Sequence, residues 1–303
     1  MVAALCGTGL VSCFTGVENT PKITEKDVSR TINELERRQP TLTISQFRDS
    51  LPLWQVGKRF YVTDNQARLL FAHIPGVDMD SVRLAGKCLT YKGYETAVGL
   101  DNRQVVDILL ADDRHTYTYH TGKTLDEFSS SFAIPLLIDM DMVTSAARQL
   151  DGKDVYIKTP IWYEVGTEHM VHGRHFIKVH IDSVLPGNKV LPLRVLFTAS
   201  DNGQKAFVWM SGGSASISNR DYDSLFGAKD MHDNYPEISD EHWALIVHGD
   251  VCEAMTKDEC RLAKGAPKQI ARQHNQAEVR EYWYYDGGSY LQFVDGLLKD
   301  FRK

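Results

Sequence analysis

Alternating apolar and polar positions run through residues 58–210 and predict a β-rich region. Short runs with a period of two, rich in β-branched and aromatic residues, recur there between turn-forming residues. The predicted strands are 58–63, 88–92, 104–110, 115–120, 155–158, 175–182, 191–198 and 205–210. The sequences Leu185-Pro186-Gly187-Asn188 and Asp201-Asn202-Gly203 are typical of hairpin turns, so the strands that flank them should pair antiparallel.

Helical spacing of apolar residues appears instead in the segments 22–38, 139–149, 242–249 and 256–264. In the first segment Thr24 is a candidate N-cap, and Pro40 ends the helix. In the last segment Thr256 is followed three residues later by Glu259, which is the spacing of a capping box. Strands 279–285, 290–294 and 297–298 follow, separated by tight turns.

A weak internal repeat runs through the β-rich region. Leu84-Ala85-Gly86-Lys87 recurs as Leu150-Asp151-Gly152-Lys153, and Val56-Gly57-Lys58 is a candidate third copy. Several short strands after each copy are typical of small antiparallel barrels. We therefore expect an α+β, β-rich fold. Residues 41–210 should form tandem barrel-like modules that resemble SH3 barrels, followed by a linker at 211–237 and a distinct C-terminal module at 238–303.

Composition places the chain among soluble globular proteins. Of its 303 residues, 43% are hydrophobic and 24% are charged, which suits two or three domains. The formal net charge of -6 argues against a nucleic-acid partner, because binding to phosphate needs a basic surface. Five cysteines are too few for a disulfide scaffold at this length.

The N-terminus reads as a targeting signal. Residues 2–12 are apolar or small, and they are too few to span a bilayer, which needs about 20 residues. They end on Leu10-Val11-Ser12-Cys13, which resembles the lipobox of bacterial lipoproteins in the style of the Bacteroides group. No Lys or Arg precedes Cys13, which departs from such signals, and a short buried strand is the alternative. We expect residues 1–13 to be the signal, Cys13 to be lipidated, and residues 14–40 to form a tether and a helix.

A family resemblance lies in the C-terminal fifth of the chain. Its elements are Gly249-Asp250-Val251, Met255-Thr256-Lys257-Asp258-Glu259, Leu262-Ala263-Lys264-Gly265-Ala266-Pro267, Trp283, Asp286-Gly287 and the segment from Tyr290 to Gly296. In this order they resemble the SmpA/OmlA (BamE-like) lipoproteins, although Ala254 and Cys260 stand where the family has glycine and valine. The resemblance implies two helices packed on a three-stranded antiparallel sheet, and a non-catalytic role in outer-membrane assembly through binding of proteins and lipid.

Candidate chemistry concentrates in the loop from Glu168 to His180. His169, His172 and His175 have a spacing that could hold a metal ion, which would make the protein an envelope hydrolase or a metal-binding enzyme. Alternation along the strand argues against the full set, because it places His175 and His180 on opposite faces. We therefore expect no metal, no cofactor and a solvated hairpin tip.

The remaining cysteines offer one further alternative. Cys252 and Cys260 flank the turn between the last two helices and could form a disulfide in an oxidising envelope. However, Cys260 occupies the position at which the resembling family carries an apolar core residue, and free cysteine is common in cores. Cys88 lies on a predicted strand and is expected to be a buried free thiol.

No familiar catalytic or nucleotide-binding motif occurs in the sequence. The favoured interpretation is a non-catalytic, lipid-anchored protein of the cell envelope that binds another envelope protein. It would face the periplasm from the outer membrane, because no acidic cluster follows Cys13. A peptidoglycan-binding module is a further alternative, and it rests on analogy with SH3-like barrels alone.

Overall fold

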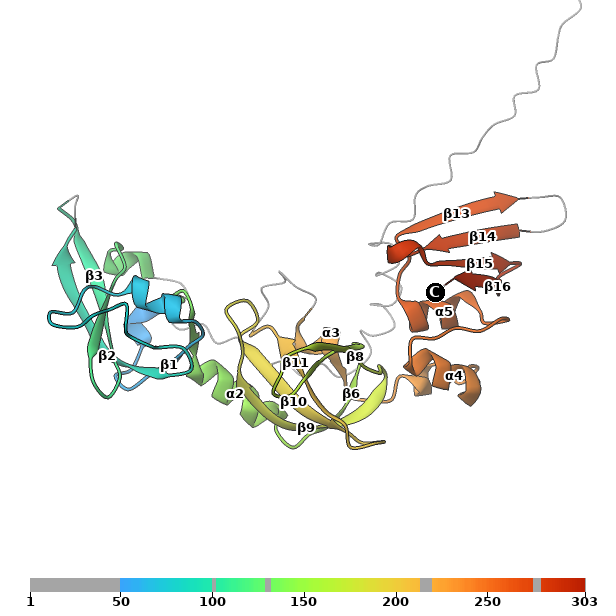
Figure 1. Ribbon diagram of the computed structural model, residues 1–303, viewed down its shortest axis with the longest axis horizontal. Coiled ribbons are helices and arrows are strands. Elements are labelled where there is room, and N and C mark those ends of the chain that lie inside the picture. The colour runs from blue at the N-terminus through green and yellow to red at the C-terminus, as the bar shows by residue number, and fades with distance from the viewer. Residues whose placement is uncertain (1–49, 100–101, 129–131, 213–219, 275–278, 303) are drawn as a thin grey trace, which may run out of the picture.

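Three antiparallel sheets follow one another along the chain in the computed structural model, each over its own hydrophobic core (Figure 1). The structure describes residues 50–99, 102–128, 132–212, 220–274 and 279–302. We call residues 50–139 the N-terminal module, 140–227 the middle module and 228–302 the C-terminal module. The predicted signal, Cys13 and the predicted helix at 22–38 lie outside the described residues.

The N-terminal module is a five-stranded sheet with the order β4-β3-β2-β1-β5. Its strands are β1 (Arg59–Val62), β2 (Cys88–Val98), β3 (Gln104–Ala111), β4 (Thr116–His120) and β5 (Leu137–Asp139), with short 3-10 helices at Leu51–Leu53, Asn65–Leu70 and Leu125–Phe128. Strand β2 runs beyond its predicted end at residue 92, because a bulge at Gly93 (φ 126°) lets pairing with β3 continue.

The middle module is a seven-stranded sheet with the order β12-β6-β9-β10-β11-β7-β8, and helix α2 (Met140–Leu150) buries Val143, Ala146 and Leu150 in its core. The strands are β6 (Asp154–Ile157), β7 (Ile161–Glu164), β8 (Met170–His172), β9 (Ile177–Pro186), β10 (Leu193–Ala199), β11 (Lys205–Met210) and β12 (Phe226–Gly227). The structure therefore shows a strand-rich α+β protein.

The segment predicted as a linker belongs partly to this sheet. Helix α3 (Tyr222–Leu225) leads into β12, which pairs antiparallel with β6. Tyr222, Leu225 and Phe226 are all buried in the middle core. The prediction of a linker through residue 237 was wrong, because these few apolar side chains anchor a segment whose average composition is polar.

The repeat seen in the sequence is a turn that the structure uses three times. Gly57, Gly86 and Gly152 all adopt positive φ (97°, 81° and 74°), which favours glycine. In each copy the glycine N–H donates to a carbonyl of a neighbouring strand at 2.9 Å; the acceptors are Tyr91, Val62 and Ile181. The three turns immediately precede β1, β2 and β6. Among the described residues, however, none of the sheets closes into a barrel, so the prediction of barrel-like modules was wrong on closure.

The C-terminal module packs two helices, α4 (Asp240–Val247) and α5 (Lys257–Lys264), with a four-stranded sheet. Its strands run in the order β13 (Gln269–His274), β14 (Val279–Tyr284), β15 (Tyr290–Val294) and β16 (Leu297–Arg302). The expected three strands are present, and β13 adds a fourth at the edge beside β14. Strand β13 escaped prediction because Ile270 is its one residue packed against the core.

The start of α5 has the predicted capping box. The Thr256 hydroxyl accepts from the Glu259 N–H at 3.3 Å, and a Glu259 carboxylate oxygen accepts from the Thr256 N–H at 2.6 Å. The second oxygen of Glu259 lies 2.6 Å from Nδ1 of His242 on α4. The cap therefore also ties the two helices together.

We expect Thr256→Ala to lower the free energy of unfolding by about 1 kcal/mol, because the hydroxyl acceptor of the cap is lost. Urea denaturation of the full chain measures this. Thr144→Ala is the control, since that exposed hydroxyl only donates within its own helix, to the Met140 carbonyl. Equal midpoints for the two variants would contradict the role given to the cap.

Candidate functional site

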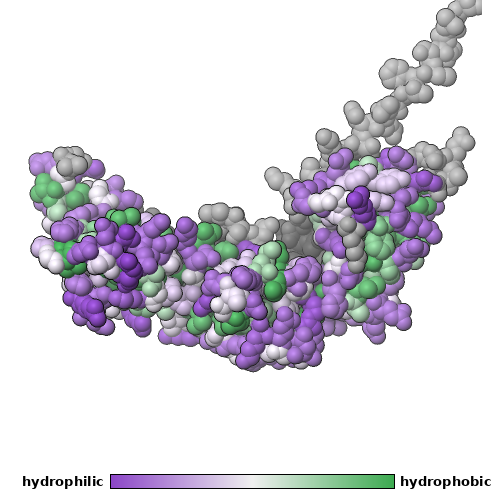
Figure 2. Space-filling model, viewed as in Figure 1, coloured by the Kyte–Doolittle hydropathy of each residue, from purple (hydrophilic) through white to green (hydrophobic). Residues whose placement is uncertain are grey.

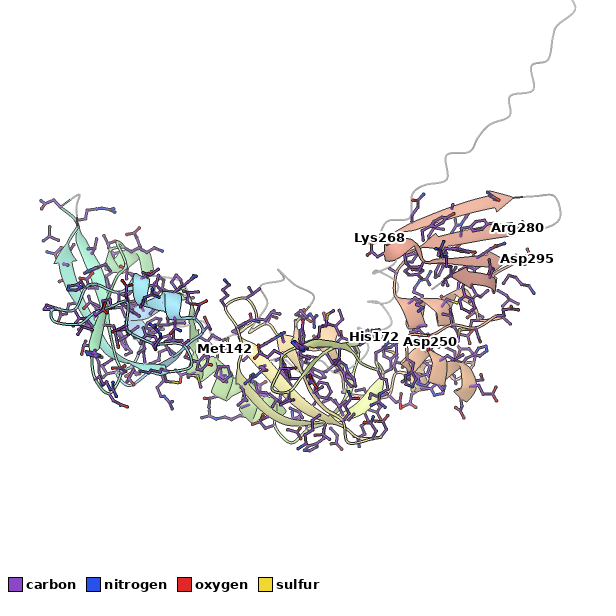
Figure 3. The ribbon with its side chains drawn as sticks, viewed as in Figure 1. Met142, His172, Asp250, Lys268, Arg280 and Asp295 are labelled. Carbon is purple, nitrogen blue, oxygen red and sulfur yellow. The ribbon has the colours of Figure 1, made fainter. Side chains whose placement is uncertain are left out.

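A cleft of about 390 Å³ lies between the middle and the C-terminal modules. The middle module contributes residues from the ends of β6 and β8 and from the turn before β9, and the C-terminal module contributes a loop before α4 and the last turn of α5. Its walls are Lys158, Pro160, His172, His175, Phe176, Met231, Asn234, Tyr235, Gly249, Arg261, Leu262, Ala263, Lys264 and Gly265. Figure 3 labels His172 at this junction.

His175 and Phe176 hold the two modules together beside the cleft. The His175 N–H donates to the Val247 carbonyl at 3.1 Å, and its Nε2 lies 3.2 Å from the Leu262 carbonyl, so Nε2 carries the proton and donates. The Phe176 ring packs against the C-terminal core, with 5.8 Å between its centroid and that of Trp243. Phe176 has φ 58°, a strained conformation for a bulky residue.

His175 is the most perturbed base of the cleft. Its side chain is 3% exposed, and burial lowers its pKa to about 4, with further lowering by His172 and His248 and an opposing contribution from the Leu262 carbonyl. Its Nδ1 is buried and has no hydrogen-bond partner. The neutral imidazole therefore keeps one unsatisfied acceptor that solvent does not reach.

This pKa predicts a loss of stability in mild acid. Because the folded pKa lies below the unfolded value of 6.5, the unfolded chain binds the proton first, and stability present above pH 6.5 falls as the pH drops toward 4. We expect a loss of about 2 kcal/mol between pH 6.5 and pH 5. Urea denaturation across this range should show a flatter profile for His175→Leu. A His175 resonance that titrates near pH 6.5 by NMR would contradict the prediction.

Positive charge surrounds the apolar walls of the cleft. Lys158, Arg261 and Lys264 line it, and none of the described lining residues is Asp or Glu. Lys158 donates to the Asp223 carbonyl at 2.8 Å, and Arg261 pairs with Asp258 at 2.8 Å. Asp258 and the C-terminus of α5 offset part of the positive charge.

The histidines predicted as a metal alternative do not gather. His169 and His172 are exposed at the β7–β8 hairpin, while His175 is buried at the module junction. His180 points elsewhere and pairs with Asp154 at 2.8 Å. Within the described ranges, no group of three His, Cys, Asp or Glu side chains is placed to hold a metal ion.

The structure has all three described cysteines as free thiols, so the alternative of a Cys252–Cys260 disulfide is not realised in it. Cys260 lies in the C-terminal core, and burial raises its pKa to about 12, which makes it an inert core residue. Cys88 is half-buried rather than buried as predicted.

Most of the cleft could not be predicted from the sequence. His172 and His175 were considered only as alternative metal ligands, and Phe176 lay inside a predicted strand. The three cations come from segments about 100 residues apart in sequence, Lys158 on one side and Arg261 and Lys264 on the other. The one local signal was Gly249, which follows the end of α4 and has a φ of 71°, a conformation that favours glycine.

Comparison with protein-family models, with curated proteins and with solved structures finds no match for the chain. Among the described helices, none has the length and apolar character needed to cross a membrane. The space-filling view shows polar side chains over most of the visible surface of all three modules (Figure 2). The interpretation of the cleft therefore rests on its own geometry.

Proposed function

We propose that this protein is a non-catalytic, lipid-anchored protein of the cell envelope that binds another envelope protein at the cleft between its middle and C-terminal modules. The proposal rests mainly on the lining of that cleft, which has apolar walls together with the cationic side chains of Lys158, Arg261 and Lys264. An enclosed apolar surface with a few fixed polar groups is the usual form of a binding site.

The residue types in the cleft support binding over catalysis. Its described lining holds no Ser, Thr or Cys to act as a nucleophile and no carboxylate to act as an acid or base. His175 is committed to the module junction through the Leu262 carbonyl. The side chains that line the cleft are therefore better suited to binding a ligand than to catalysing its reaction.

The N-terminal sequence supports the parts of the proposal that concern anchoring through Cys13 and location at the outer membrane. The C-terminal motifs support the likeness to the SmpA/OmlA family. Two helices against an antiparallel sheet support the latter at the level of architecture. SH3-like modules remain part of the proposal as partly open sheets that begin at the repeated glycine turns.

Lipidation is tested by feeding cells an alkyne-labelled fatty acid and expressing the chain from its own locus. Label should appear on the protein and disappear in the Cys13→Ala variant, which should also leave the membrane fraction. Label that persists in Cys13→Ala would overturn the anchor.

Binding at the cleft is tested by placing a photo-crosslinking amino acid at position 172 or 264 in living cells. Both positions are exposed at the cleft, whereas Lys299 is an exposed control on β16 of the same C-terminal module. We expect one discrete protein adduct from the cleft positions and none from position 299. Equal adducts at all three positions, or none at the cleft, would overturn the proposal.

A further inference from the structure

We infer that the partner binds through an extended segment of its own chain, which pairs with strand β8 as an added strand beside the cleft. This inference rests on the proposed function, because it names the kind of partner segment that binds there. Three observations support it: the unpaired backbone of β8, the apolar face beside its edge, and the position of its last residue at the cleft.

Strand β8 has one free edge. It ends the strand order of the middle sheet, and in the described part of the chain it pairs only with β7. The Gly173 N–H donates to the Pro160 carbonyl at 2.6 Å, and the Glu164 N–H donates to the His169 carbonyl at 2.9 Å. Hydrogen-bonded pairs alternate along an antiparallel ladder, so Val171 is the one residue of β8 whose backbone bonds to β7.

The N–H and C=O groups of Met170 and His172 therefore point to the open side of β8. No backbone group of the described residues pairs with them. Both side chains are exposed, that of Met170 to 69%, so solvent reaches this edge. An extended chain offers a matching row of donors and acceptors, whereas the backbone of a helix is already bonded within itself.

The face of the sheet beside this edge is apolar. On the side away from the middle core, Met170 lies across from Tyr163, Tyr163 across from Phe207, and Phe207 across from Leu196. The rings of Tyr163 and Phe207 stack with 5.4 Å between their centroids. The outer face of an antiparallel sheet is commonly polar, so this row is unusual. An apolar side chain of the added strand would extend the row past Met170.

His172 connects the edge to the cleft, because it is the last residue of β8 and lines the cleft wall. A segment that pairs along β8 therefore reaches the cleft at its end. Strand β8 also carries no Lys or Pro, the residues that commonly protect an edge from pairing. The edge strand β13 differs on both counts, since it carries Arg272 and contributes no residue to the described lining of the cleft.

The first test combines the photo-crosslinking amino acid at position 264 in living cells with Met170→Pro. Proline removes the outward N–H of Met170, which has no partner within the described fold, so the urea midpoint should stay close to that of the parent chain. The yield of the adduct should fall at least about tenfold. Met170→Ala, which keeps the N–H, should lose less than about threefold.

The second test needs no variant. In the complex crosslinked at position 264, the amide hydrogens of Met170 and His172 should exchange at least about tenfold more slowly than in the free chain. Ile270 and Arg272 have outward amides on the open edge of β13, and their exchange should not change.

An adduct that persists in Met170→Pro, an equal loss in Met170→Ala, or unchanged exchange at Met170 and His172 would each overturn the inference and leave the proposed function standing. Absence of an adduct at position 264 in the parent chain would overturn both. Exchange at these two amides that slows as the concentration of the chain alone rises would assign the edge to a second copy, which also contradicts the inference.

Discussion

Replacing Trp283 by alanine should lower the free energy of unfolding of the C-terminal module by about 3–5 kcal/mol, enough to unfold it. Trp283 lies on the central strand β14 and is 0% exposed. Its ring is 4.7 Å from that of Phe293, and the Arg261 guanidinium lies 5.1 Å above it. The variant therefore loses a large apolar surface and leaves a cavity beneath the helices.

A buried polar network adds to this cost. The Trp283 indole N–H donates to Glu281 at 2.6 Å, and Glu281, which is 3% exposed, also accepts from Lys257 at 2.9 Å and from Arg272 at 2.7 Å. These partners hold the pKa of Glu281 below its usual range against the opposing effect of burial. Without the indole, a buried carboxylate oxygen loses its donor, which costs about 1–3 kcal/mol more.

The measurement is urea denaturation of the full chain, followed by NMR signals of the C-terminal module. Tyr284→Ala is the matched control, because this neighbouring aromatic is 41% exposed and should cost under about 1 kcal/mol. If Trp283→Ala costs no more than Tyr284→Ala, the placement of this core is wrong.

A fragment of the C-terminal module should begin at or before residue 228, because Met231, Tyr235 and Ile238 also pack in its core.

Replacing Lys58 by alanine should cost about 3 kcal/mol, the second large effect. The Lys58 side chain is 2% exposed, and its Nζ lies 2.8 Å from Asp139 and 2.6 Å from Asp141 at the start of α2. Hydrogen bonds to the two carboxylates raise its pKa although burial alone would lower it. The variant would leave the carboxylate of Asp139 partly buried without this cation, and it would loosen the N-terminal module from α2.

Lys87→Ala is the control for this prediction. Lys87 is half-exposed, and its Nζ lies 3.7 Å from Asp112, so the pair should contribute less than about 1 kcal/mol. Thermal denaturation of both variants gives the comparison. Similar shifts in Tm would show that the Lys58 cluster does not join the N-terminal module to α2.

Local signals in the sequence located most strands and the three predicted helices that lie within the described residues. Turn residues such as Gly86 and Gly152, and caps such as Thr256, act within a few residues of themselves, so they can be read from sequence. Strands β5, β7, β8, β12 and β13 were not predicted because they are short or polar. In addition, β5, β7 and β12 depend on pairing with strands that are distant in sequence. The sequence also could not show that the sheets are open, because barrel closure depends on whether the two edge strands of a sheet pair with each other.

The cleft could not be predicted for the same reason. It lies where Phe176, at positive φ, packs against the core of a module that begins about 50 residues later. His175 was predicted to lie in a solvated hairpin tip, but it is buried. An alternating pattern cannot show that its Nε2 faces the Leu262 carbonyl. Sites built between modules depend on tertiary contacts that no local pattern records.

Hydrogen exchange on the crosslinked complex tests the central claim, that the partner binds in the cleft, most directly. Backbone amides are compared in the full chain with and without the bound partner. We predict slowed exchange at residues 158–162, 172–177, 231–235 and 261–266, with β2, β3 and β4 of the N-terminal module unchanged. Protection confined to the N-terminal module, or to the edge strand β13, would contradict the claim.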